Sequence, residues 1–129
     1  MKARILLIED NPQNRYLTRF LLEQRGHQVI EAETGPRGLE LALEFRPDLI
    51  LLDIQLPVLD GYEVARTLKD HEELGAIPII AITSYAMVGD RERCLNAGAV
   101  AYLEKPINPD TFVMDVECCL ATPQQDEFS

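Results

Sequence analysis

Short aliphatic runs alternate along the chain with longer segments in which apolar residues recur at helical spacing. The short runs are typical of strands buried in a parallel sheet, and the longer segments are typical of helices that cover such a sheet. Strands are predicted at residues 4–8, 28–32, 49–53, 77–82 and 100–103. Helices are predicted at 12–25, from 34–36 to 47, from 60 or 61 past 68, at 87–97, and from 109 to a polar tail at 122–129.

Five strand–helix units in succession predict an α/β domain with a parallel sheet, because parallel neighbours need crossover connections that a helix can provide. We expect one domain over residues 1–121, followed by the polar tail. The helix residues expected to face the core are Leu17, Phe20, Leu21 and Gln24, then Leu39, Ala42 and Leu43, then Val64, Ala65 and Leu68, and finally Phe112, Val113, Val116 and Leu120.

The predicted third strand ends in a carboxylate. Four aliphatic residues, 49–52, run without a break and stop at Asp53. In open α/β folds the ligand site lies at the carboxyl edge of the sheet, where such a strand ends. Aspartate is also common in turns, so Asp53 taken alone is equally consistent with a turn residue. The residues that follow the other strands bear on this choice.

Polar side chains follow most of the predicted strands at the same edge of the sheet. They are Glu9 and Asp10 after the first strand, Asp53 after the third, Thr83 and Ser84 after the fourth, and Lys105 after the fifth. Each of them alone is consistent with a solvated loop residue. Because parallel strands place all their carboxyl ends at one edge, the six residues together predict a binding site there.

The chemistry of these residues suits phosphoryl transfer. Three carboxylates in one site repel one another, so we expect a hard divalent cation, most simply Mg²⁺, to hold them together. A carboxylate such as Asp53 can act as a nucleophile toward phosphorus. The ammonium of Lys105, the hydroxyl of Thr83 and the backbone N–H of Ser84 would then stabilise charge on the phosphoryl oxygens.

Composition narrows the possible partners. The chain has 129 residues, of which 47% are hydrophobic, and this suits one packed domain. Its net charge of −10 argues against a broad basic face for nucleic acid or an anionic membrane. No apolar run is long enough to span a membrane, and the start does not resemble a signal peptide, so we expect a cytoplasmic protein. Cys94, Cys118 and Cys119 lack a metal-ligand spacing and are expected to be reduced thiols.

Taken together, these residues resemble the receiver domain of two-component response regulators. The resemblance covers residues 3–121 and extends to stand-alone receivers. It rests on Glu9-Asp10, on Leu51-Leu52-Asp53 followed by Leu56-Pro57 and Asp60-Gly61, on Ile82-Thr83-Ser84, and on Glu104-Lys105-Pro106. The family implies a flavodoxin-like (βα)5 three-layer sandwich whose five-stranded parallel sheet has the order 2-1-3-4-5.

The resemblance also implies a role for each site residue. Asp53 would accept a phosphoryl group from a histidine kinase or a histidine phosphotransfer protein. Mg²⁺ would be bound by Asp10, by Asp53, by the backbone carbonyl of Gln55 and, mainly through water, by Glu9. Thr83, Ser84 and Lys105 would contact the phosphoryl group, and a cis peptide bond before Pro106 would help Lys105 turn back toward Asp53.

By the same resemblance, Thr83 and Tyr102 form a switch that couples phosphorylation to the face made by helix four, strand five and helix five. A downstream protein target is expected to bind there. Many receivers carry Met at the position of Gln55, and Tyr85 lies two residues after Thr83. Since both positions flank the phosphoryl group, we expect Gln55 and Tyr85 to tune the phosphate lifetime, with Tyr85 shielding the phosphorus from water.

Three other functions remain open from the sequence. One is a phosphatase with an aspartyl nucleophile, which usually needs a second acid near that nucleophile, whereas residue 55 is an amide. Another is a pseudo-receiver that acts only as a docking scaffold, although the full set of acceptor residues is present. The third is a flavodoxin-like electron carrier. We expect a signalling module and not a metabolic enzyme, and no direct binding of nucleic acid, while the oligomeric state is left open.

Overall fold

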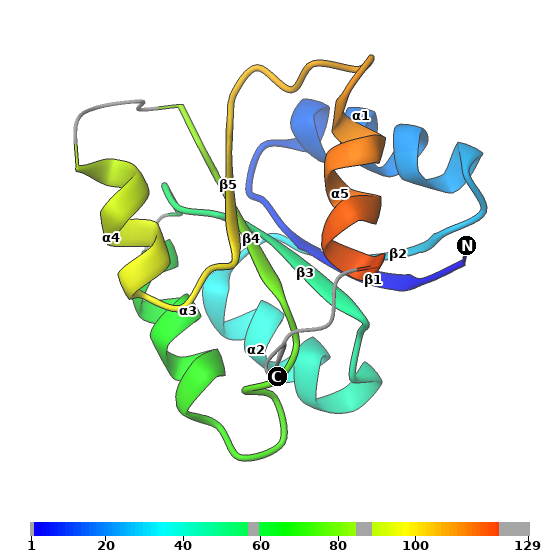
Figure 1. Cartoon of the computed structure of the whole chain (residues 1–129). Coiled ribbons are helices and arrows are strands. Elements are labelled where there is room, and N and C mark those ends of the chain that lie inside the picture. Colours follow the sequence, from blue (N-terminus) through cyan, green and yellow to red (C-terminus); the bar gives the residue numbers. More distant parts are fainter. Residues whose placement is uncertain (1, 57–59, 85–88, 122–129) are drawn as a thin grey trace.

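In the computed structural model, which describes residues 2–56, 60–84 and 89–121, five parallel strands form one sheet with helices on both faces (Figure 1). The strands are β1 (Arg4–Ile8), β2 (Gln28–Ala32), β3 (Leu49–Asp53), β4 (Ile79–Thr83) and β5 (Ala101–Glu104). They are hydrogen-bonded in the order β2-β1-β3-β4-β5. This confirms the predicted α/β class and strand order.

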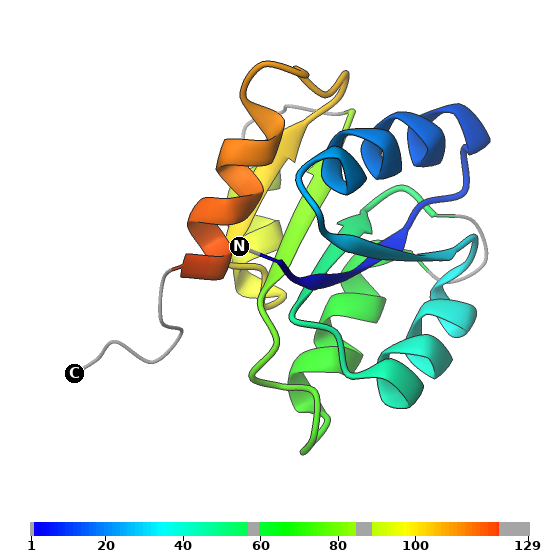
Figure 2. The ribbon, with the colours of Figure 1, turned by 90° about the vertical axis from the view of Figure 1, so that its right-hand side faces the viewer.

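The helices divide into two layers. Helices α1 (Pro12–Gln24) and α5 (Phe112–Ala121) cover one face of the sheet, and α2 (Gly35–Phe45), α3 (Gly61–Asp70) and α4 (Asp90–Asn96) cover the other (Figure 2). Each layer encloses its own apolar cluster, because alternate residues of the strands point to opposite faces. In the described part of the chain, no helix combines the length and the apolar character that a membrane span requires.

The middle of the sheet positions the carboxyl edge. All five residues of β3 and all five of β4 are buried, as expected for central strands that helices cover on both sides. The register pairs Ile8 with Leu52 and Asp53 with Ile82. The polar residues at the carboxyl ends of β1, β3 and β4 therefore lie near one another at one edge of the sheet.

Two of the predicted helix faces are partly wrong. In α1 the buried residues are Thr18 and Leu22, whereas Phe20 and Gln24 are exposed. Phe20 stacks on Tyr16, with the ring centroids 6.2 Å apart, on the outside of the helix. The core stripe is displaced because Leu22 faces the sheet in place of Gln24.

In α2, Leu41 and Ala42 are buried and the predicted core residue Leu43 is exposed. The close approach of this helix to the sheet occurs instead at Gly38, whose missing Cβ leaves room for the side chain of Ile8. The predicted faces of α3 and α5 are confirmed, since Val64, Ala65, Leu68, Phe112 and Val116 are buried and Val113 and Leu120 pack against the core.

The ends of several elements also differ from the predictions. The first helix ends at Gln24, one residue early, before Gly26 with φ +91°. The fourth and fifth strands begin and end one or two residues later than predicted. The last helix starts at Phe112 and not at Pro109, because residues 109–111 form a turn. In this turn the N–H of Asp110 donates to the side-chain oxygen of Asn108.

Three expectations fall on parts of the chain outside the described residues. They are the start of the fourth helix at Met87, the side chain of Tyr85, and the polar tail at 122–129. One other expectation is confirmed, because the Lys105–Pro106 peptide bond is cis. Of the three cysteines, Cys94 is buried and Cys118 is exposed, and no disulfide joins them in the described part of the chain.

Gly61 makes the connection after β3 possible. An added Cβ would lie 2.4 Å from the Cα of Ile54 and 2.6 Å from the carbonyl oxygen of Asp53. The N–H of Gly61 also donates to the carbonyl of Ile54 at 3.0 Å. Because both neighbouring groups are backbone, they cannot move aside without displacing the end of β3. The first residue of α3 is thus packed directly against the strand that carries Asp53.

Gly61→Ala is therefore expected to lower the free energy of unfolding by about 1–3 kcal/mol, the usual range for forcing extra atoms into a packed site. Arg66→Ala is a matched control on the exposed face of the same helix, and it should change stability by less than about 0.5 kcal/mol. Urea denaturation of both variants gives the comparison. Equal stability of Gly61→Ala and the parent chain would show that α3 does not rest on β3 in this way.

Candidate functional site

Asp53 lies at the end of the most buried part of the sheet. Its side chain is only 3% exposed. One carboxylate oxygen, Oδ1, accepts the backbone N–H of Gln55 at 2.9 Å, and the other, Oδ2, lies 3.1 Å from Nζ of Lys105. The carboxylate is thus fixed in orientation, with a charged partner on one side.

Two further carboxylates join Asp53 at this edge. Glu9 and Asp10 follow β1, and Glu9 is buried whereas Asp10 is exposed. Glu9 accepts the N–H of Asn11 at 3.2 Å and lies 3.1 Å from Nζ of Lys105. One oxygen from each of Glu9, Asp10 and Asp53 lies within 4.8 Å of the others. The three acids therefore lie close together, as the sequence predicts.

Burial and nearby charges alter the acidity of Glu9 and Lys105. Burial raises the pKa of Glu9 to about 7, and the nearby charge of Asp53 adds to the rise. Burial by itself lowers the pKa of Lys105, but the charges of Asp53 and Glu9, with the hydrogen bonds to both, outweigh it and raise this pKa above its ordinary value. Lys105 therefore stays charged at neutral pH, while Glu9 is divided between its protonated and ionised forms.

Thr83 and Tyr102 lie on neighbouring strands. Thr83 is buried at the end of β4, and its carbonyl accepts the backbone N–H of Lys105 at 2.8 Å. Tyr102 is half-buried on β5, opposite Ala81. The hydrogen bond from Lys105 places the start of the β5–α5 connection beside Thr83, so its lysine is directed to the same edge as the three acids.

Gln55 has a contact that the sequence did not predict. Its side-chain oxygen Oε1 accepts the backbone N–H of Ser84 at 3.0 Å. This is the same N–H that was expected to contact a phosphoryl group, so in this structure the Gln55 amide occupies it. The contact joins the loops after β3 and β4. No sequence pattern could have shown it, because it depends on how the Gln55 side chain folds back. Tyr85, predicted to flank the site, lies outside the described residues.

A contact of Arg15 with the site was also not predicted from the sequence. Arg15 is placed in the first turns of α1, and its guanidinium reaches the backbone of the loop that carries Glu9 and Asp10. The spacing of Arg15 from the N-cap Asn11 is a signal for this contact. A long side chain one helical turn after the N-cap can turn back over the loop that precedes the helix.

The three carboxylates form a suitable donor set for a hard divalent cation. Such ions take oxygen ligands, and Mg²⁺ commonly combines one or two carboxylates with several waters. Asp10 is exposed and lies next to two buried acids, so a cation held here would keep access to solvent. The residues present therefore fit Mg²⁺, and a bound cation would relieve the repulsion between Glu9 and Asp53, which adds to the effect of burial on the pKa of Glu9.

Comparison with known proteins finds the same fold and similar sequences. The family model of the response regulator receiver domain matches residues 5–117. The polar-differentiation response regulator DivK of Brucella anthropi is 45% identical over 120 residues, which are 93% of this chain and 98% of that protein.

Two solved structures extend the comparison. The receiver domain of the sensor histidine kinase PA1611 from Pseudomonas aeruginosa, solved with a magnesium ion in its active-site cleft, is 37% identical. It aligns with a TM-score of 0.86 over 95% of this chain and all of that one. The chemotaxis response regulator CheY4 of Vibrio cholerae is 25% identical and also has a TM-score of 0.86, over 92% of this chain and 98% of that one.

The raised pKa of Glu9 predicts how stability changes with pH. Unfolded Glu9 loses its proton near its ordinary pKa of 4.5, whereas folded Glu9 keeps it up to about 7. Within this window the folded state binds more protons, so raising the pH favours unfolding. The contribution of Glu9 to the stability of the metal-free protein should therefore be full below the lower value and should be lost as pH rises through the upper one.

Urea denaturation of metal-free wild type and Glu9→Gln at a series of pH values across this window measures the effect. Titrating groups that do not interact with Glu9 are common to both proteins, so their contributions cancel in the difference. We expect the stability of wild type, relative to Glu9→Gln, to decrease as the pH rises. A constant difference across the window would show that Glu9 has an ordinary pKa.

Proposed function

The chain belongs to the response regulator receiver domain family of two-component signalling, and from this premise we propose that Asp53 accepts a phosphoryl group from a phosphohistidine. The donor would be a histidine kinase or a histidine phosphotransfer protein.

One observation carries the proposal. A buried carboxylate, that of Asp53, lies 3.1 Å from the ammonium of Lys105 and within 4.8 Å of the two acids that follow β1. A nucleophile toward phosphorus, a fixed cation and a donor set for a second cation are thus joined at one edge of the sheet. In-line phosphoryl transfer depends mainly on such positioning and neutralisation of charge.

The transfer step needs no reactant other than the phosphohistidine. An oxygen of Asp53 forms a bond to phosphorus while the phosphorus–nitrogen bond of the phosphohistidine breaks. The electron pair of that bond stays on the imidazole nitrogen. Lys105, already within hydrogen-bond distance of Asp53, would stabilise the negative charge of the phosphoryl oxygens. In the later hydrolysis, a water oxygen forms a bond to phosphorus while the bond to the Asp53 oxygen breaks, which releases inorganic phosphate and restores the carboxylate.

Mg²⁺ is the proposed cofactor, and when bound it supplies positive charge to the phosphoryl oxygens. Asp10 and Asp53 would hold it directly, Glu9 mainly through water, and Gln55 through its backbone carbonyl. Supporting this, the carboxylate oxygens of Glu9, Asp10 and Asp53 converge in the structure, and the related PA1611 receiver domain was solved with magnesium in its cleft.

The residues around the acceptor would bind its phosphoryl group and respond to it. Thr83 and the N–H of Ser84 are proposed to bind phosphoryl oxygens, which requires Gln55 to release the N–H that it now occupies. Thr83 and Tyr102 are proposed as the switch toward the face of α4, β5 and α5, where a downstream protein would dock. The adjacent positions of β4 and β5 support such coupling.

We propose a signalling module that catalyses only its own phosphorylation and dephosphorylation. A phosphatase would need a further acid, besides those proposed to bind Mg²⁺, placed to protonate the leaving group. The side chain two residues after Asp53 is the amide of Gln55, which cannot do so, and it is held by Ser84. A scaffold that works without phosphorylation would leave Asp53 unmodified, and this is the outcome that the next experiment can detect.

Asp53→Asn should abolish phosphorylation, because an amide is a poor nucleophile. In the presence of Mg²⁺ and acetyl phosphate, wild type is expected to gain one acid-labile phosphoryl group, measured by intact mass. Asp110→Asn, which alters an exposed aspartate after β5, should be labelled like wild type. Labelling of Asp53→Asn at another residue would relocate the acceptor, and no labelling of wild type would favour the scaffold.

Asp10→Ala should remove most of the response to Mg²⁺. Millimolar Mg²⁺ is expected to raise the melting temperature of wild type, because any ion that binds the folded state stabilises it. Asp10 is exposed, so its loss should leave the metal-free fold intact. Asp70→Ala, at the exposed end of α3, is the control and should respond like wild type. The same Mg²⁺-dependent rise in Asp10→Ala would show that Asp10 is not a ligand.

A further inference from the structure

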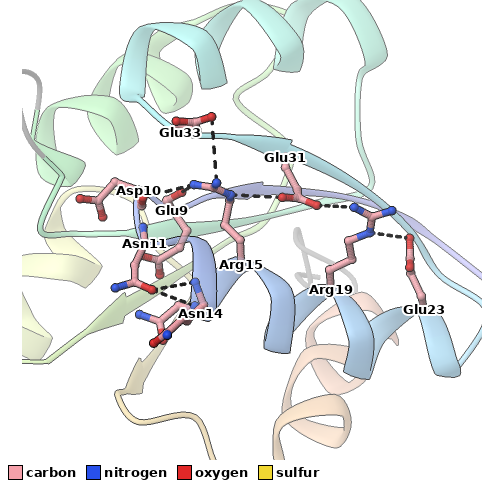
Figure 3. Close-up of polar contacts among 10 residues, drawn as sticks. Glu9, Asp10, Asn11, Asn14, Arg15, Arg19, Glu23, Glu31 and Glu33 are labelled. Carbon is pink, nitrogen blue, oxygen red and sulfur yellow. Dashed lines mark hydrogen bonds and ion pairs between the residues drawn. The ribbon is translucent and has the colours of Figure 1, made fainter.

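Arg15 holds the backbone of the acidic loop from outside the site. Its side chain leaves α1 and turns back over the residues that follow β1 (Figure 3). One guanidinium nitrogen, Nη1, donates to the carbonyl oxygen of Glu9 at 2.9 Å and to that of Asp10 at 3.2 Å. These are the carbonyls of the two residues whose carboxylates join Asp53, so a single group fixes two consecutive peptide units beneath the acids.

The same guanidinium is anchored to β2. Its Nε lies 3.2 Å from Oε1 of Glu31, and its Nη2 lies 4.0 Å from Oε2 of Glu33. The Arg15 side chain is only 14% exposed. A planar guanidinium can serve several acceptors at once in a fixed geometry, which a lysine ammonium cannot do. Arg15 therefore ties the acidic loop to the neighbouring strand.

Arg19 provides an internal comparison one turn further along α1. It binds the other oxygen of Glu31 at 2.8 Å and also Glu23 at 3.2 Å (Figure 3). Its side chain is 52% exposed, and the loop carbonyls of Glu9 and Asp10 are bound by Arg15 and not by Arg19. The two arginines thus share a carboxylate partner and differ in their contact with the loop.

The charge of Arg15 does not compete with a cation at the acidic cluster. It is paired with Glu31, and Glu33 lies close by. The contact of Arg15 with the loop is through carbonyl oxygens, so its guanidinium does not occupy the carboxylate oxygens of Glu9 and Asp10. What Arg15 supplies to the site is orientation.

We propose that Arg15 is a positioning residue for the metal site, which sets the directions of the Glu9 and Asp10 carboxylates through their peptide units. This rests on the proposed binding of Mg²⁺ at these acids. Groups that orient ligands from behind commonly contribute about 10- to 100-fold to metal affinity. Mg²⁺ demands near-ideal octahedral geometry, whereas Ca²⁺ accepts irregular sites. Loss of orientation should therefore weaken Mg²⁺ more than Ca²⁺.

The test compares Arg15→Gln with Arg19→Gln. The dissociation constants of MgCl₂ and CaCl₂ are measured on the full chain by amide NMR titration, well below the melting temperature of each variant. Arg15→Gln should weaken Mg²⁺ binding about tenfold and lower the preference for Mg²⁺ over Ca²⁺. Arg19→Gln should leave both affinities within about twofold of wild type, because it removes a guanidinium from the same Glu31 without touching the loop.

Arg15→Lys keeps the charge and gives a second variant should Arg15→Gln fail to fold. It should also lose preference for Mg²⁺, since an ammonium cannot bridge two carbonyls and Glu31 in the same geometry. If Arg15→Gln or Arg15→Lys has a lower melting temperature but unchanged metal affinity and selectivity, Arg15 is only structural and the inference is overturned.

The role of Arg15 and the role of Asp53 as acceptor can be overturned independently. Normal phosphorylation of Asp53, together with wild-type Mg²⁺ and Ca²⁺ binding in both Arg15 variants, would overturn the role of Arg15 and leave the acceptor in place. Lack of phosphorylation on Asp53, together with the predicted loss of Mg²⁺ selectivity, would overturn the acceptor and leave the role of Arg15.

Discussion

Repulsion among three carboxylates is the constraint around which this edge of the sheet is built. Glu9 and Asp53 are buried, and their oxygens and one oxygen of Asp10 lie within 4.8 Å of one another. Like charges so close in a buried setting are costly unless they are compensated. Lys105 supplies one compensation, at 3.1 Å from both buried acids, and a proton on Glu9 supplies another, as its pKa of about 7 indicates. A bound cation would be the third.

The rest of the fold keeps these groups together against that repulsion. Strands β3 and β4 are buried along their whole length, so Asp53 and Thr83 cannot move away without exposing the core. Gly61 lets α3 pack on the backbone of Asp53 itself. On the other side, Arg15 holds the peptide units of Glu9 and Asp10 and links them to β2 through Glu31. Packing and hydrogen bonds thus hold the carboxylates together against a repulsion that a bound cation would relieve.

The fold and the meeting of the acids could be predicted because both follow from local patterns. An aliphatic run that stops at a carboxylate marks a strand end, and parallel strands bring such ends to one edge. The buried faces of α1 and α2 were harder to predict, because Phe20 and Leu43 are as apolar as their buried neighbours. Only the packed structure shows which residue contacts the sheet. The contacts of Gln55 with Ser84 and of Arg15 with the loop depend on side-chain conformation, which has no periodic signal in the sequence.

We propose that the carboxylate cluster is a cation-assisted acceptor site with Asp53 as the nucleophile. A crystal structure of the chain with Mg²⁺ and beryllium fluoride, a mimic of the phosphoryl group, tests it most directly. We expect beryllium bonded to a carboxylate oxygen of Asp53, Mg²⁺ bound by Asp10 and Asp53, and the N–H of Ser84 turned from Gln55 to a fluoride. Beryllium on another side chain, or Mg²⁺ away from these acids, would contradict it.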